Sequence, residues 1–281
     1  MKRRALIAGL ALILTTVASL AQAKEWKTVR FATEGAYAPW NFKTPNGDLD
    51  GFDVDLAKDL CQRMRVECEI VEQDWDGIIP ALQAGKYDAI IASLTITDAR
   101  KKAIDFSKVY ADTPRTFLIA KQGPLQGLAM DDKTYSLAKD SVGAQKQIDA
   151  LKPVLKGKTI GVQVNTTGEA FLQKYMQDVV EVRSYKTAEQ YLLDLSAGRI
   201  DAALDNIAYL GGVLNSSSGA ALRLAGPRLN DGVFGGGKAI GIRKGEEDLK
   251  SMLDAALDSA IADGTVKKLS THWFGIDVTP Q

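Results

Sequence analysis

The chain has 281 residues, of which 46% are hydrophobic, 25% charged and 7% aromatic, and these ordinary values exclude a fibrous, low-complexity or wholly disordered protein. Its 35 Lys and Arg residues balance its 35 Asp and Glu residues, so no basic excess is available to neutralise nucleic-acid phosphates. We therefore expect no nucleic-acid partner, and the length suits one large domain or two of moderate size.

Residues 1–23 have the pattern of a secretory signal peptide. Three basic residues at 2–4 precede the apolar run ALIAGLALILTTVASLA, and AQA at 21–23 has the small-x-small pattern of a cleavage site. A membrane anchor is the alternative, but the apolar run is short and contains threonine and serine. We expect cleavage after Ala23, which leaves 32 basic against 35 acidic residues, a formal charge of −3. The mature protein is then exported and soluble.

The first part of the mature sequence alternates strand and helix patterns. The segments expected in this order are a strand at 28–34, an amphipathic helix at 51–64, a strand at 68–73, a helix at 76–85 and a buried strand at 88–95. Such alternation predicts βαβ units and a parallel sheet.

Cys61 and Cys68 are the two cysteines of the chain. In an exported protein we interpret them as a disulfide that joins the end of the first helix to the strand after it. Two free, buried thiols are the alternative.

A similar series begins again at residue 158. Its expected segments are a strand at 158–164, a helix at 166–176, a strand at 179–185, a helix at 187–199 and a strand at 200–206. AGKYDAIIA at 84–92 and AGRIDAALD at 197–205 are alike, and the order of elements around them matches. Two related lobes are therefore the better interpretation.

Two further segments complete the chain. The stretch 122–157 is polar and is expected to be a surface insertion with a short helix around 143–155. A glycine-rich segment that leads into a strand, at 234–244, precedes helical patterns at 246–264 and 265–275. No GxGxxG or GxxxxGKS/T pattern occurs, so we interpret GGG as a bend and do not expect nucleotide binding.

Polar and aromatic residues follow the expected strands, at the sheet edge where open α/β sheets bind ligands. They are Glu34, Tyr37, Trp40, Trp75, Ser93, Thr95, Arg100, the segment QVNTTG at 163–168, Asp205 and Asn206. The guanidinium of Arg100, near two hydroxyl residues and a new helix start, suits capture of a carboxylate. Glu34 beside aromatic rings suits a cationic group. Taken alone, Arg100 is better explained as a surface residue, and Glu34 is equally compatible with a helix cap or a surface acid. Tyr37 and Trp75 are more often core or rim aromatics, so the hypothesis rests on all of them falling at corresponding strand ends.

Catalytic and metal-binding residues are scarce. His272 is the only histidine, which excludes a multi-histidine metal site, and no spare cysteine offers a nucleophile. The acidic run at 48–55 lacks the terminal glutamate of a calcium loop. We expect neither a metal nor a cofactor.

At TEGAYAPWNF, GFDVDLAKDLC, WDGIIPAL, DAIIASLTIT-x-x-R and AGRIDAAL, the sequence resembles the periplasmic amino-acid-binding proteins of ABC importers. The resemblance spans the mature chain and is greatest to the histidine, lysine/arginine/ornithine and opine branch, especially the octopine- and nopaline-binding members. It implies the α/β two-lobed periplasmic binding fold of type II, with residues 24–112 plus about 236–281 in lobe 1 and 113–235 in lobe 2. Crossovers near 111–114 and 227–236 would form the hinge.

The resemblance also implies roles for individual residues. Arg100 would bind the ligand α-carboxylate with help from Ser93, Thr95, Thr166 and Thr167. The Ala92 carbonyl would meet the ligand amine and Glu34 its distal cationic group. Tyr37 and Trp75 would enclose the aliphatic stem or the guanidinium of the ligand, and the opposing wall would be formed by Gln163, Asn165 and Gly168.

The position of Asn206 bears on the identity of the ligand. Amino-acid binders have an aspartate there that pairs with the free α-ammonium, whereas the octopine-type protein has asparagine. A neutral amide tolerates an amine that carries an extra carboxylate, which favours an opine-like ligand. Asn165 stands where relatives have Gly or Ser, and Val164 where they have smaller or polar residues, which would narrow that space. Asp205 would substitute for the missing aspartate if the strand register differs.

The resemblance implies a monomeric binding protein that delivers its ligand to permease subunits in the inner membrane. A plain basic amino acid is the alternative ligand. A binding protein that feeds a chemoreceptor or sensor, and an enzyme like cyclohexadienyl dehydratase with Glu34 as its acid or base, are the alternative functions.

Overall fold

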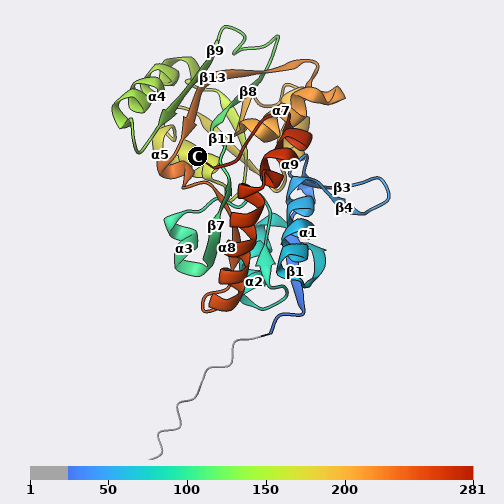
Figure 1. The fold of residues 1–281 in the computed structure, drawn as a ribbon. Helices are drawn as coiled ribbons and strands as arrows, with labels where there is room; N and C mark the ends of the chain where they lie inside the picture. Colours follow the sequence, from blue (N-terminus) through green and yellow to red (C-terminus); the bar gives the residue numbers. More distant parts are fainter. Residues whose placement is uncertain (1–24, 281) are drawn as a thin grey trace, which may run out of the picture.

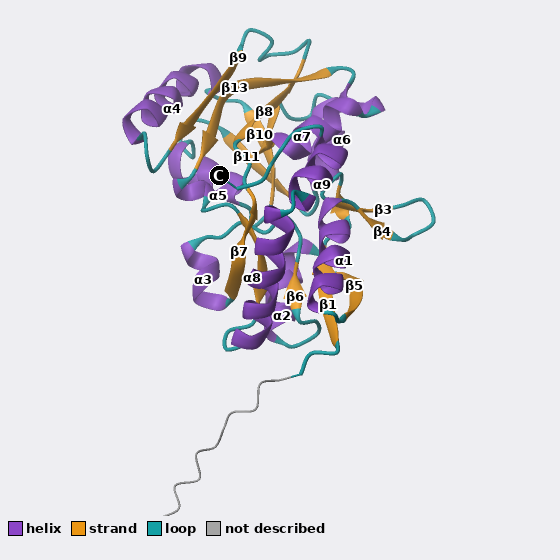
Figure 2. Ribbon diagram, in the orientation of Figure 1, coloured by secondary structure: helices purple, strands orange, loops and turns teal. Residues whose placement is uncertain are grey.

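A computed structural model describes residues 25–280; the expected signal peptide at 1–23 lies outside the described residues. The described chain folds into two lobes, each a β-sheet flanked by helices (Figure 1). The separation of the two sheets is also evident when the elements are coloured by type (Figure 2). The predicted α/β, two-lobed architecture is thus confirmed.

The first sheet has strand order β5-β1-β6-β14-β7. Its strands are β1 (Thr28–Thr33), β5 (Glu67–Glu72), β6 (Ala89–Ile90), β7 (Asp105–Ala111) and β14 (Lys238–Ile242). Strand β1 runs parallel to β5 and β6, whereas β14 is antiparallel to β6 and β7. The helices that pack on this sheet are α1 (Phe52–Met64), α2 (Ile78–Gln83), α3 (Asp98–Ala103) and α8 (Glu247–Ala262).

The second sheet repeats this plan with strand order β11-β10-β12-β8-β13-β9. Its strands are β8 (Arg115–Ala120), β9 (Met130–Ser136), β10 (Thr159–Gln163), β11 (Glu181–Tyr185), β12 (Ala202–Asn206) and β13 (Leu222–Asn230). Strand β10 is parallel to β11 and β12, and β8 is antiparallel to β12 and β13. The helices of this lobe are α4 (Ser141–Leu155), α5 (Thr167–Tyr175), α6 (Ala188–Ser196) and α7 (Ile207–Asn215).

Smaller elements connect and close the lobes. They are the three-stranded sheet β2 (Ala36–Tyr37), β3 (Asn41–Lys43) and β4 (Leu49–Asp50), the 3₁₀ turns η1 (Trp75–Gly77), η2 (Ser217–Gly219) and η3 (Gly232–Phe234), and helix α9 (Thr265–Phe274). Helix α9 contacts α1 and α8 of the first lobe and α7 of the second. The chain passes between the sheets twice, from β7 to β8 and from β13 to β14.

The two strand–helix series predicted from the sequence are present, and their matching sheet orders confirm two related lobes. In both, a helix ends at a glycine with positive φ, 76° at Gly85 and 69° at Gly198, before the next strand. Because side chains other than glycine rarely adopt this conformation, the two similar sequence segments reflect the same helix stop.

Three local expectations were wrong. The strand expected at 88–95 covers only Ala89–Ile90, since the chain turns at Ser93, where φ is 48°. The polar stretch 122–157 is not only a surface insertion: β9 pairs in parallel with β13 and forms the edge of the second sheet, and α4 buries Ile148 and Leu155. The second crossover was expected near 227–236, but residues 227–230 still pair with β9. The chain therefore leaves the second sheet only after β13 ends at 230.

Cys61 in α1 and Cys68 in β5 form the predicted disulfide, with their Cα atoms 5.7 Å apart. It ties the last turn of a helix to the adjacent strand. Helices of the described chain are all too short or too polar to span a bilayer.

Candidate ligand-binding cleft

The cleft between the lobes gathers residues from the carboxyl ends of strands in both sheets. Its inner cavity is lined by Glu34, Tyr37, Trp75, Ala92, Ser93, Thr95, Arg100, Arg115, Gln163, Thr166, Thr167, Gly168, Leu204, Asp205 and Asn206. Twelve of the thirteen ligand-contact residues expected from the sequence are in this set. The exception is Asn165, which faces a neighbouring pocket.

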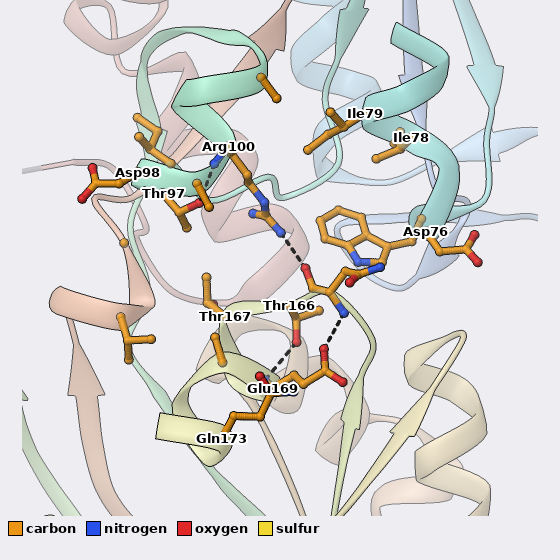
Figure 3. A pocket seen from close by; sticks show the side chains of 18 of the residues that line it. Asp76, Ile78, Ile79, Thr97, Asp98, Arg100, Thr166, Thr167, Glu169 and Gln173 are labelled. Carbon is orange, nitrogen blue, oxygen red and sulfur yellow. Dashed lines mark hydrogen bonds between the residues drawn. The ribbon is translucent and has the colours of Figure 1, made fainter. Parts of the chain in front are cut away.

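Arg100 lies in α3 and reaches across to the other lobe. Its Nη1 donates to the carbonyl of Thr95 at 2.8 Å, and its Nη2 donates to the carbonyl of Asn165 at 3.0 Å. Figure 3 shows the side chain pointing from α3 toward the segment that precedes Thr166. The guanidinium also lies over the Trp75 ring, 5.2 Å from its centroid. Burial, and next the charge of Arg115, lower the pKa of Arg100 to about 10, so it remains cationic at neutral pH.

Opposite Arg100 is the beginning of α5. Thr166 caps this helix: its Oγ1 accepts a hydrogen bond from the amide of Glu169 at 3.3 Å and donates to the Gln163 carbonyl at 2.7 Å. Gly168 in the first turn lies so close to the Leu204 carbonyl that an added Cβ would be 3.2 Å from it. Free amides at a helix start together with a guanidinium favour a carboxylate ligand.

Glu34 follows β1 and is 7% exposed. Its Oε1 accepts a hydrogen bond from Nε2 of Gln163, across the cleft, at 2.6 Å. Desolvation raises the pKa of Glu34 to about 7, and the hydrogen bond from Gln163 opposes part of this rise. A carboxylate in this setting is stabilised by a cationic partner, which is consistent with the cation-binding role expected of it.

Tyr37 is held by the second lobe. Its hydroxyl donates to Oδ1 of Asp205 at 2.5 Å and accepts from Nδ2 of Asn206 at 2.6 Å, and its ring stacks on Tyr209 with centroids 4.2 Å apart. Trp75, by contrast, donates from Nε1 to the Val164 carbonyl at 2.9 Å. The two aromatic residues expected to enclose one ligand stem therefore have different partners.

A buried carboxylate supports the floor of the cleft. Asp53, at the start of α1, accepts from the backbone amide of Ser93 at 2.9 Å, from Nδ2 of Asn41 at 2.8 Å and from the Tyr110 hydroxyl at 2.9 Å. The bond from Ser93 holds the backbone of that residue, whose φ is 48°, and the other two bonds hold the carboxylate. No signal in the sequence distinguished Asp53 from an ordinary first-turn acid.

Arg115 is a cleft residue that the sequence analysis missed. It begins β8, which is antiparallel to β12, so its amino end lies beside the carboxyl end of β12 in the register Arg115↔Asn206. Because Arg115 stands at the amino end of its strand, it is not found when only the carboxyl ends of strands are considered. Asp205, expected at this sheet edge and as a substitute for an aspartate at 206, also lines the cavity.

A larger pocket of about 710 Å³ adjoins the inner cavity and shares Trp75, Arg100, Thr166 and Thr167 with it (Figure 3). Asn165 lines this pocket, and its backbone amide donates to Oε2 of Glu169 at 2.8 Å. Within residues 25–280, no group of three or more His, Cys, Asp or Glu side chains could hold a metal ion.

Comparison with known proteins defines the class of protein to which this fold and cleft belong. Residues 29–276 match the family of bacterial extracellular solute-binding proteins, family 3. The chain belongs to this family. It is 40% identical over 285 residues to the octopine-binding periplasmic protein of Rhizobium meliloti, covering 95% of this chain and 96% of that protein.

Other relatives bind amino acids. The L-arginine-binding protein of Pseudomonas aeruginosa is 37% identical, over 99% of this chain and 98% of its own. A solved structure described as an ancestral arginine-binding protein bound to arginine superposes with a TM-score of 0.72 at 34% identity, covering 89% of this chain and 99% of the other. The resemblance to amino-acid-binding proteins inferred from the sequence is thus confirmed.

Proposed function

We propose that this protein captures a cationic amino acid, or an opine-type derivative of one, in the cleft between its lobes and delivers it to an ABC importer. The observation that carries the proposal is the pairing of opposite charges in one cavity, with Arg100 and the start of α5 on one side and Glu34 on the other. This arrangement matches an α-carboxylate at one end of a ligand and a positive group at the other. The relatives that bind octopine and arginine support the same chemistry.

The remaining expected contacts have supporting roles in the proposal. Ser93, Thr95, Thr166 and Thr167 assist Arg100, the Ala92 carbonyl and Asn206 receive the amine, and Gln163 and Gly168 shape the opposing wall. Asn165 contributes its backbone carbonyl, which accepts from Arg100. Tyr37 and Trp75 contact the stem from two sides.

Ligand entry requires the lobes to separate. The inner cavity is about 40 Å³, whereas small-molecule sites occupy roughly 300 Å³ or more. We assign residues 24–112 and 236–281 to lobe 1 and residues 113–235 to lobe 2, with the two passages between the sheets as the hinge. A ligand that contacts both lobes favours their association because its affinity for the closed arrangement is greater.

The wider setting follows from the family. We propose export by the segment 1–23 with cleavage after Ala23, a periplasmic location, a monomeric state and docking onto permease subunits in the inner membrane. Delivery to a sensor is compatible with the same cleft, and a pull-down of membrane partners distinguishes it from transport.

One observation favours a second candidate. A pKa of about 7 suits Glu34 to general acid–base catalysis, as an enzyme like cyclohexadienyl dehydratase requires. We propose a binding protein rather than an enzyme because Glu34 is hydrogen-bonded to Gln163 and faces the cation-binding end of the cleft. Turnover of prephenate or arogenate by the purified protein would overturn this assignment.

The test of the proposed function is a thermal-shift screen of the mature protein with arginine, lysine, ornithine, histidine, octopine and nopaline, followed by calorimetry. A ligand present at about 100 times its Kd stabilises the folded state by about 2.7 kcal/mol, so a true ligand raises the melting temperature measurably. Glutamate, which lacks the cationic end, is the control ligand. A shift with glutamate alone, or with none of the six, would contradict the proposal.

A further inference from the structure

Arg115 is a second buried guanidinium in the inner cavity, and the roles proposed above give it no task. The residue is 8% exposed. Its Nη2 donates to Oγ1 of Thr95 at 3.0 Å, and its guanidinium lies over the Phe234 ring at 5.1 Å. Within residues 25–280, this is the one hydrogen bond of its side chain, and the carboxylates Asp205 and Asp112 act on it only through space.

Arg115 and Arg100 share one residue as a partner. Arg100 donates to the carbonyl of Thr95, while Arg115 donates to the hydroxyl of the same residue. Two like charges held this close in a desolvated site repel each other, and burial of an unpaired cation is unfavourable. Asp205 attracts Arg115 through space, but its two carboxylate oxygens already accept hydrogen bonds from Tyr37 and Tyr191. With Asp205 engaged by these two tyrosines, the guanidinium of Arg115 remains available to an acid group of a ligand.

The register of the second sheet locates this extra charge. Arg115 in β8 is the cross-strand partner of Asn206 in β12, the residue that we propose to receive the ligand amine. A substituent on that amine therefore extends toward Arg115, while the α-carboxylate of the same ligand is held by Arg100. A ligand with two carboxylates would pair one with each guanidinium.

We propose that Arg115 is a specificity-determining residue that binds a second carboxylate, so that the preferred ligand is an N-(1-carboxyalkyl) derivative of a cationic amino acid rather than the free amino acid. This inference rests on the proposed function of the cleft. It accounts for the two guanidiniums of the cavity, since a dicarboxylate neutralises both.

The test compares three ligands by isothermal titration calorimetry: arginine, Nα-methylarginine and octopine. Nα-methylarginine has a substituted amine without the second acid, so it separates amine substitution from carboxylate binding. We expect octopine to bind the wild-type protein at least tenfold more tightly than Nα-methylarginine. If those two ligands bind equally, the role of Arg115 is overturned although the proposed function stands. If no ligand binds, the proposed function itself fails.

The second arm uses Arg115→Gln and Arg115→Lys, with Arg183→Gln on the surface of the second lobe as the matched control. Arg115→Gln is expected to weaken octopine at least tenfold and to change arginine less than threefold, and Arg115→Lys to restore part of the octopine affinity. An equal loss for both ligands would show that Arg115 only supports Thr95 and would refute the proposal. Should Arg115→Gln not fold by circular dichroism, the wild-type ligand comparison and Arg115→Lys decide.

Discussion

Gln163 and Glu34 belong to different lobes, yet Nε2 of Gln163 donates a 2.6 Å hydrogen bond to Oε1 of Glu34. The bond links the end of β10 with the end of β1, strands that occupy equivalent places in the two sheets. The same carboxylate is proposed to hold the cationic end of the ligand. One side chain therefore takes part both in a contact between the lobes and in the proposed recognition of the cation.

Arg100→Ala should abolish high-affinity binding of ligands with an α-carboxylate. Loss of a charged hydrogen-bonding group costs about 1.5–3 kcal/mol, which corresponds to a loss of roughly tenfold or more in affinity measured by calorimetry. Arg183→Ala, a surface arginine paired with Glu181, is the control. Near-normal affinity in Arg100→Ala would show that the carboxylate binds elsewhere.

Glu34→Gln should weaken cationic ligands by more than about 1 kcal/mol, since it removes the charge and retains the shape. Because the pKa of Glu34 is about 7, cation affinity of the wild-type protein should rise as the pH increases through 7 and fall below it. Titration calorimetry from pH 5.5 to 8.5 measures this dependence. The pH dependence should vanish in Glu34→Gln and persist in Glu67→Gln, a control at an exposed position. A wild-type affinity that does not change with pH would contradict the pairing of Glu34 with the ligand cation.

The same substitution should stabilise the ligand-free protein at high pH. A carboxyl whose pKa is raised on folding binds more protons in the native than in the unfolded state, so stability is lost as pH rises from about 4.5 to about 7. The loss is at most about 3 kcal/mol. Glu34→Gln should therefore melt at a higher temperature than wild type at pH 8 and similarly at pH 4. A lower melting temperature at pH 8 would mean that the ionised carboxylate is stabilising.

Asn206→Asp should shift preference toward free arginine. Oδ1 of Asn206 caps α7 by accepting from the Tyr209 amide at 3.0 Å, and aspartate can keep that bond. The new charge would attract a free ammonium and repel the second carboxylate of octopine. We expect the arginine-to-octopine affinity ratio to rise about tenfold. Asn46→Asp on the exposed β3–β4 turn is the control; an unchanged ratio in Asn206→Asp would remove this residue from ligand selection.

Removal of the disulfide by Cys61→Ala with Cys68→Ala should lower stability without altering binding. Closing a loop of about eight residues is worth roughly 2.5 kcal/mol in chain entropy. Chemical denaturation measures this loss, and calorimetry should give wild-type affinity because neither cysteine lines the cleft. Reduction of the wild-type protein should have the same effect. Equal stability of the two forms would contradict the expected role of the crosslink.

Much of the fold was predictable because helical and strand periodicities are local properties of the chain. The helix at α1 and the strands β10 to β12 follow the sequence pattern closely. Strand β9 was missed because its residues are largely polar and only Tyr135 is buried. It is a strand because it pairs with β13, not because it has a buried apolar face.

Most of the cleft was predictable because parallel strands bring their carboxyl ends to one edge. Arg115 was not, since its contribution depends on β8 running antiparallel to β12, which is a property of the assembled sheet. Asp53 was missed for a related reason. Its three donors come from β3, from the turn at Ser93 and from β7, and only the folded chain brings them together.

The indole of Trp75 gives the molecule an optical reporter of its own. Of the four tryptophans, all within residues 25–280, it is the one that lines the inner cavity, where it donates to the Val164 carbonyl and lies against the guanidinium of Arg100. The Val164 carbonyl belongs to the other lobe, so this hydrogen bond is lost when the two halves part. Its fluorescence emission should consequently follow the opening and shutting of the crevice in real time, without any attached dye.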